Sequence, residues 1–136
     1  IEGRTNHIVW MAGNFVNMRY GLANVLGSKE PDPYNDLFFR AKALDENNTY
    51  PTLKELKENF HKVSPFIYNA LLTITDARLS EEFPLHMNVS FFPETVLNFV
   101  GMCIGREDYL SGQMGLMRRI LNYPGMKYEV DEHITY

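Results

Sequence analysis

Cysteine and long apolar runs are scarce in this sequence, and each shortage excludes a class of protein. The single cysteine, Cys103, excludes an internal disulfide framework and suits a reducing compartment, so we expect a cytoplasmic protein. No apolar run reaches the length of a membrane span and no signal peptide is visible, so we expect no membrane partner. The 13 Lys and Arg residues are outnumbered by 17 Asp and Glu residues, which gives no electrostatic reason to expect nucleic acid.

What the sequence does have is enough apolar material, 45% of 136 residues, for one sizeable core. We therefore predict a single domain over residues 1–136. The first residue is Ile1 and not methionine, which we interpret as native sequence with a segment missing upstream.

Helical spacing of apolar residues predicts three long helices, at about 6–26, 53–75 and 93–122, and a short one at 36–44. The first has Thr5 or Asn6 as its cap and ends at Gly27. The short one follows Asn35 as a cap, and the next long one starts with a capping box, Thr52 to Glu55. Pro65 falls inside that helix and should bend it without ending it.

The stretch 93–122 is the longest run with a helical period, and we expect the other helices to pack against it. Pro93 suits its first turn, and Arg118 and Arg119 suit its last turn. Steps of three and four residues define a seam centred on Leu110, whose members are Cys103, Glu107, Leu110, Met114, Met117 and Leu121. Four glycines inside this helix each cost about 0.8–1 kcal/mol relative to alanine. We interpret Gly101, Gly105, Gly112 and Gly115 as points where neighbouring helices approach closely.

Long helices joined by long links predict an all-α bundle. Three long helices leave one side of such a bundle open. A fourth helix upstream of Ile1 would close it, and a partner chain is the alternative.

Two stretches carry a family resemblance. Arg106-Glu107-Asp108-Tyr109-Leu110-Ser111-Gly112-Gln113-Met114, followed by Met117-Arg118-Arg119-Ile120-Leu121, resembles the last-helix signature of the DinB/YfiT-like superfamily, His-Glu-x-x-His-x-Gly-Gln with a later Leu-Arg-Arg-Leu-Leu. Asn6-His7-Ile8-Val9-Trp10-Met11-Ala12-Gly13-Asn14 resembles the Asn-x-Ile-x-Trp-x-x-Gly-His stretch of the same family.

This resemblance implies a DinB-like up-down-down-up four-helix bundle, frequently a homodimer, with a three-histidine site for nickel or zinc. Relatives include thiol-dependent S-transferases and isomerases. Carried over residue by residue, the three ligand positions are Asn14, Arg106 and Leu110, and none is histidine. Leucine donates no electron pair and arginine stays cationic, so we expect the metal site to be degenerate and predict no metal or other cofactor.

The four histidines do not rebuild such a site by spacing, because His7, His61, His86 and His133 include no pair three or four residues apart. We expect each to have a structural role. Glu107 on the helical seam needs a partner, and we expect either Arg106 or a cation from another helix to supply it. The alternative is that Arg106 leaves the bundle as a surface cation.

Trp10, Tyr109 and Gln113 complete the candidate binding residues around Asn14, Arg106, Glu107 and Leu110. The loss of all three metal ligands favours a non-catalytic small-molecule-binding or interaction module. The alternative is a thiol-dependent S-transferase or hydrolase-type enzyme that uses substituted ligands or no metal. A purely dimerising structural role is a third possibility. The first two differ in whether the structure has a cavity lined by Asn14, Trp10, Arg106, Glu107 and Tyr109 with polar groups that face inward.

Overall fold

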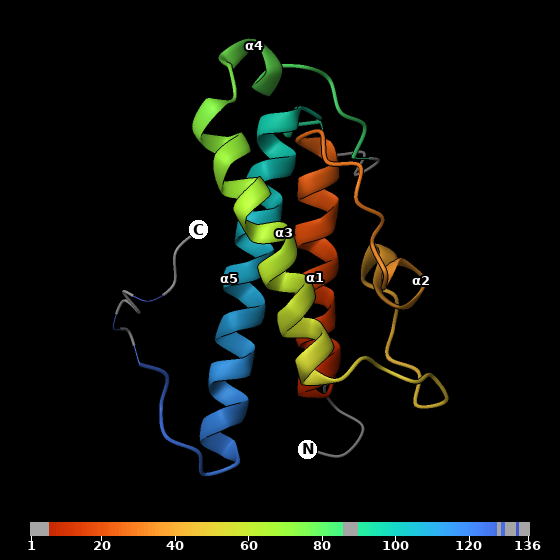
Figure 1. Ribbon diagram of the computed structural model, residues 1–136, viewed down its shortest axis with the longest axis vertical. Coiled ribbons are helices and arrows are strands. Elements are labelled where there is room, and N and C mark those ends of the chain that lie inside the picture. The colour runs from red at the N-terminus through yellow and green to blue at the C-terminus, as the bar shows by residue number, and fades with distance from the viewer. Residues whose placement is uncertain (1–5, 86–89, 128, 130–132, 134–136) are drawn as a thin grey trace.

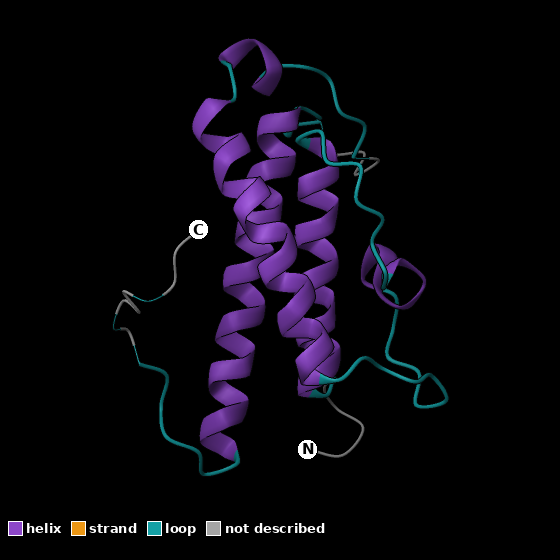
Figure 2. Cartoon of the chain, viewed as in Figure 1, coloured by secondary structure: helices purple, strands orange, loops and turns teal. Residues whose placement is uncertain are grey.

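The computed structural model is all-α in the part of the chain that it describes, residues 6–85, 90–127, 129 and 133 (Figures 1 and 2). The elements are α1 (Ile8–Val25), α2 (Asn35–Phe38), the 3₁₀ turn η1 (Phe39–Ala41), α3 (Leu53–Thr73), α4 (Asp76–Leu79) and α5 (Val96–Ile120). Three long helices are thus present where the apolar spacing predicted them. Thr5 and His86 lie outside the described residues.

The central helix is α1, which packs against both α3 and α5. In the described chain, α3 and α5 have no Cα atoms within 8 Å of each other, so α1 joins them. Figure 1 shows that α1 and α3 run in the same direction while α5 runs in the opposite one. The link over 26–52 crosses the molecule from one end to the other, which is why α3 can start beside the beginning of α1.

Both ends of α1 are capped by residues that are close to them in sequence. The N-cap is His7, whose Nδ1 accepts a hydrogen bond from Trp10 N at 2.9 Å, so the predicted caps Thr5 and Asn6 were wrong by one or two residues. An imidazole nitrogen can replace the usual hydroxyl or carboxylate acceptor there. At the other end Gly27 has φ 107°, as expected for a left-handed C′ residue.

The predicted short helix over 36–44 is shorter and broken. One turn of α2 is followed by η1, in which Arg40 and Ala41 have φ of 54° and 52°. Left-handed backbone costs a non-glycine residue roughly 1–2 kcal/mol, so packing of the link must offset this. Phe38, fully buried at 0% exposure, is the residue that anchors the link to α1.

The capping box of α3 is confirmed, because Thr52 and Glu55 exchange hydrogen bonds. Pro65 lies inside α3 and does not end it, as predicted. The start of α5 differs from the prediction. Its N-cap is Thr95, and Pro93 precedes the helix, where its carbonyl accepts a hydrogen bond from Asn98 Nδ2 at 2.7 Å. An antiparallel β-bridge between Glu82 and Thr95 connects the segment before α5 to the start of that helix.

The described residues form two core clusters, one around Tyr20 and Cys103 and one around Trp10, Phe38 and Leu110. Cys103 and Leu110 of the predicted α5 seam are buried, whereas Leu121 is 52% exposed.

The interpretation of the α5 glycines was wrong. A Cβ at Gly101, Gly105 or Gly112 would meet nothing within 4 Å, and one at Gly115 would meet Met126. Close approach of another helix of the described chain therefore does not explain these glycines. The glycine that does need a missing side chain is Gly13 of α1, whose Cβ would lie 2.1 Å from Phe38 Cζ.

In the part of the chain described here, no helix has both the length and the apolar character required to span a bilayer.

Candidate functional site

The three positions carried over from the family's metal site meet at one place between α1 and α5. Asn14 is 1% exposed, and its Oδ1 accepts hydrogen bonds from Arg106 Nε at 3.1 Å and Arg106 Nη2 at 3.0 Å. Leu110 lies one turn along α5, packed with Trp10 and Phe38. Two of the three positions thus bond to each other, and the third is part of the core.

This donor set does not fit a divalent metal ion. The only ligand-type oxygen among the three side chains, Asn14 Oδ1, already accepts two N–H groups from a cation. Arg106 carries a positive charge at this point and Leu110 has no donor atom. In the described ranges, no three His, Cys, Asp or Glu side chains gather closely enough to bind a metal ion.

Two of the other candidate residues border this point and one does not. Trp10 is 3% exposed, and its Nε1 has no hydrogen-bond partner among the described residues. Tyr109 is 56% exposed, with its ring centroid 5.3 Å from Arg106 Cζ. Gln113 is half-buried and lines none of the cavities described below.

Glu107 takes its cation from another helix. Arg19 of α1 places Nε 2.8 Å from Glu107 Oε1, and its Nη2 donates to Oε2 at 3.0 Å. The same guanidinium donates to Ser64 of α3 and lies 4.1 Å from the ring centroid of Phe60. This Arg19–Glu107–Ser64 node joins all three long helices. Of the two partners expected for Glu107, Arg106 and a cation from another helix, the second is therefore the correct one.

Burial raises the pKa of Glu107 above its ordinary value, and the Arg19 hydrogen bond and charge oppose that rise. Arg106 and Glu107 are adjacent in sequence, but their side chains contact different partners from different faces of α5. Arg106 lies with Asn14, and Glu107 lies with Arg19.

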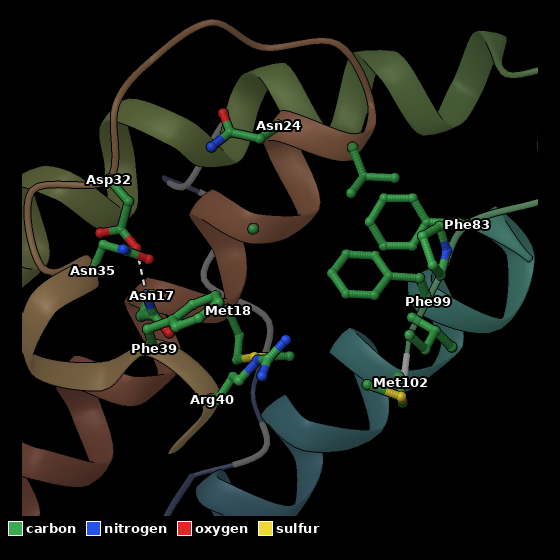
Figure 3. A pocket seen from close by; sticks show the side chains of 14 residues that line it. Asn17, Met18, Asn24, Asp32, Asn35, Phe39, Arg40, Phe83, Phe99 and Met102 are labelled. Carbon is green, nitrogen blue, oxygen red and sulfur yellow. Dashed lines mark hydrogen bonds between the residues drawn. The ribbon is translucent and has the colours of Figure 1, made fainter. Parts of the chain in front are cut away.

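The structure is hollow beside Met18, Arg40 and Met102. A cavity of about 470 Å³, here called the main cavity, opens between α1, the link that carries η1, the segment 83–85 and the first half of α5 (Figure 3). Its lining residues are Asn17, Met18, Gly21, Asn24, Val25, Asp32, Asn35, Phe39, Arg40, Phe83, Pro84, Leu85, Phe99 and Met102. Asn17, Asn35 and Asp32 gather on one side, whereas the rings of Phe83 and Phe99 lie together on the other.

A second hollow, here called the side cavity, has a volume of about 420 Å³. It is lined by Met18, Arg40, Ala41, Met102, Gly105, Arg106 and Tyr109. Met18, Arg40 and Met102 line both cavities, so the two adjoin. Together they form a groove that is mainly apolar in the main cavity and carries two guanidinium groups in the side cavity.

Asp32, the one carboxylate among the described residues that line the main cavity, already accepts hydrogen bonds. Asp32 Oδ1 accepts a hydrogen bond from Tyr34 N at 2.8 Å, and Oδ2 accepts one from Asn17 Nδ2. Burial raises the pKa of Asp32, and these two hydrogen bonds oppose the rise. By contrast, no carboxylate of the described chain lies within 4.0 Å of Arg40 or Arg106.

Sequence reasoning missed most of this lining. One usable signal existed on α1, where Asn14, Asn17, Gly21 and Asn24 recur at steps of three and four and form a small polar stripe on an apolar helix. For Arg40, Phe83 and Phe99 no local signal existed. Arg40 and Phe83 lie in links, so their place in the groove depends on how those links fold over the helices, whereas Phe99 lies in the first turn of α5 and contacts Phe83.

His7 and His61, two of the described histidines, lie in different parts of the bundle. His7 caps α1, and its ring packs edge-on against Tyr50 with centroids 5.0 Å apart. His61 lies on α3 beside the Phe60 ring.

Comparison of this chain with family models, with curated proteins and with solved structures gives no match. The resemblance to the DinB/YfiT-like superfamily therefore depends on the two sequence stretches around Trp10 and Leu110.

Proposed function

We propose that this chain is a non-catalytic, DinB-like small-molecule-binding module, in which an Asn14–Arg106 contact replaces metal coordination. The observation that carries the proposal is the groove beside that contact, with cavities of about 470 and 420 Å³. These volumes fall in the range typical of small-molecule sites. The directions of the three long helices also fit the last three helices of an up-down-down-up bundle (Figure 1).

The alternative, a thiol-dependent S-transferase or hydrolase-type enzyme, has less support. The chain's own thiol, Cys103, is fully buried and burial raises its pKa to about 12, so it is not a ready nucleophile. An enzyme of this type would need an external thiol and a group to activate it. In the described chain, the groove offers Arg106, Arg40 and the Tyr109 hydroxyl for that task.

The test is a thermal-shift screen of small molecules on the wild-type chain and on Gly21→Leu. A Cβ at Gly21 would lie 3.8 Å from Phe99 Cζ, which is ordinary contact, so leucine should fold while filling part of the main cavity. We expect compounds that raise the melting temperature of the wild type to lose that effect in Gly21→Leu. Gly101→Leu is the matched control, because its Cβ would meet nothing within 4 Å.

The proposal that these compounds bind in the groove would be overturned if they raise the melting temperature of Gly21→Leu as much as that of Gly101→Leu. A second measurement addresses the enzyme alternative. After incubation with nickel or zinc and removal of free ion, we expect less than stoichiometric metal in the protein. Stoichiometric metal would contradict the proposal and favour the enzyme.

We also propose that the chain forms a homodimer through the exposed side of α5. Ile104 and Leu116 are 48% and 61% exposed there, and between them a Cβ at Gly105 or Gly112 would meet no described atom within 4 Å. Apolar side chains exposed along one helix are typical of protein–protein contacts.

A further inference from the structure

We infer that the ligand of the groove is an amphipathic organic anion, whose charged head lies between Arg40 and Arg106 and whose apolar body lies in the main cavity. This inference rests on the proposed function, because it specifies the ligand class of the same groove. It is carried by three features of the described residues: two guanidinium groups without a carboxylate, a shared boundary between the cavities, and an aromatic wall.

The charge balance is the first argument. Arg40 and Arg106 both line the side cavity, and no described carboxylate lies within 4.0 Å of either. Arg106 Nε and Nη2 bond to the neutral Asn14 amide, which fixes the guanidinium but leaves its charge uncompensated. Guanidinium groups bind carboxylate, sulfonate or phosphate through paired charge-assisted hydrogen bonds, so two at one cavity favour an anionic head.

The position of Arg40 supports this assignment. It extends from η1 into the space between α1 and α5, beside Met18 (Figure 3). The backbone holds it there at φ 54°. Its charge therefore faces the boundary of the two cavities, where a head group and a body would join.

The aromatic wall indicates what the head is attached to. The rings of Phe83 and Phe99 lie with centroids 4.9 Å apart at the far side of the main cavity (Figure 3). Met18 and Met102, which are flexible and polarizable, complete the path from these rings to Arg40. An alkyl chain or an aryl ring would bury apolar surface along this path.

Asp32 is the carboxylate that a cationic ligand would need, but it is already hydrogen-bonded within the protein. Its two oxygens already accept hydrogen bonds from Tyr34 N and Asn17 Nδ2. A cationic ligand would have to compete for this carboxylate while its own charge approached two arginines. The groove should therefore discriminate between amphiphiles of opposite charge but equal length.

The experiment uses decanoate, decanamide and decylammonium below their aggregation limits, measured by isothermal titration calorimetry on the intact chain. We expect decanoate to bind at least about tenfold more tightly than decanamide, and decylammonium more weakly than both. We expect Arg40→Gln to weaken decanoate binding about tenfold while leaving decanamide unchanged. Arg40 is exposed, so this variant should fold.

Arg119→Gln is the matched control, because it removes an exposed arginine at the far end of α5. Arg106→Lys is a second test: it keeps the charge but loses the planar fork, and should weaken decanoate binding less than Arg106→Gln does. Inorganic phosphate alone should bind far more weakly than decanoate, because it has no apolar body.

Two outcomes would overturn the inference. One is decanamide binding as tightly as decanoate, and the other is an equal loss from Arg40→Gln and Arg119→Gln. If Gly21→Leu still abolishes binding in either case, the groove remains the site and only the anion preference fails. If Gly21→Leu binds decanoate like the wild type, the proposed function fails as well.

Discussion

At the scale of single residues, Cys103 is expected to be chemically silent in the folded protein. It is 0% exposed, and burial together with the nearby Glu107 charge raises its pKa from 9.0 to about 12. The thiolate is the reactive form, so a thiol reagent should label Cys103 only after unfolding. Labelling with Ellman's reagent in buffer and in concentrated guanidinium chloride checks this. Prompt stoichiometric labelling in buffer would contradict the buried position.

The same shift makes stability depend on alkaline pH. A thiol whose folded pKa is raised stays protonated in the native state while the unfolded state loses its proton. Cys103 thus lowers the free energy of unfolding as pH rises from about 9 to about 12. We expect Cys103→Ala to show a flatter alkaline decline in urea midpoint than the wild type, although it costs stability at neutral pH through lost packing.

The Arg19–Glu107 pair should matter more than any exposed pair of the described chain. Both side chains are only 18% exposed, so Arg19→Met leaves a carboxylate largely out of water. We expect a loss of about 2–3 kcal/mol in the free energy of unfolding, below the upper range for fully buried pairs. Lys54→Met, which breaks a pair with 85% and 62% exposed side chains, should change it by less than about 0.5 kcal/mol.

This loss should shrink in acid. Arg19 opposes the burial that raises the pKa of Glu107, so removing Arg19 raises that pKa further. Once protonated, Glu107 no longer carries an unpaired charge. The destabilisation of Arg19→Met should therefore decrease as pH falls from neutral towards the ordinary carboxyl pKa of 4.5. Urea unfolding at neutral and acidic pH measures it, and a constant difference would exclude Glu107 as the cause.

At the scale of elements, the link over α2 and η1 should be sensitive to one methyl group. A Cβ at Gly13 would lie 2.1 Å from Phe38 Cζ, and Phe38 anchors this link on α1. Gly13→Ala should lower the free energy of unfolding by about 1–3 kcal/mol, despite its better helix propensity. Gly101→Ala, in open space, should raise it by about 0.5–1 kcal/mol.

A double variant separates the clash from other effects. If Phe38 is the obstacle, Phe38→Leu combined with Gly13→Ala should cost less than the sum of the two single changes. Chemical denaturation of all four proteins gives this coupling energy. Additive costs would show that Gly13 does not support the link through Phe38.

The elements also show what local sequence signals can and cannot predict. The capping box from Thr52 to Glu55 and the left-handed Gly27 were predictable, because each depends on residues a few positions apart. The break at Arg40 was not, since it is imposed by packing of the link. Likewise a partner for Glu107 could be expected from its place on the seam, but Arg19 lies 88 residues away.

For the candidate site, too, some features could be predicted from the sequence and others could not. That Asn14, Arg106 and Leu110 would come together followed from the family resemblance, and the structure places them in contact or in adjoining turns. The groove itself was not predictable, because its walls include Phe83 and Arg40 from links whose course has no periodic pattern. Of the residues expected to line a cavity, Arg106 and Tyr109 line the side cavity, whereas Asn14, Trp10 and Glu107 line neither cavity of the groove.

At the scale of the whole molecule, we expect α5 to pair with a second copy of itself, as in the proposed homodimer. Positions on its outer side are arranged symmetrically about residue 110, with Ile104 and Gly105 on one side and Leu116 and Gly115 on the other. In an antiparallel two-fold pair centred there, Leu116 would face Ile104 of the partner copy, and Gly105 would face the partner copy's Gly115 after Met126 moves away.

This arrangement gives the last prediction. The wild-type chain should elute as a dimer in size-exclusion chromatography with light scattering, and Leu116→Glu should elute as a monomer, because it would bring a charge against an apolar contact. Leu72→Glu is the matched control, since Leu72 is 66% exposed on α3, away from α5. A monomeric wild type at high concentration, or an equal effect of both variants, would exclude α5 as the contact. If Leu116→Glu is monomeric and still binds decanoate, the groove works within one copy and the pairing serves a separate purpose.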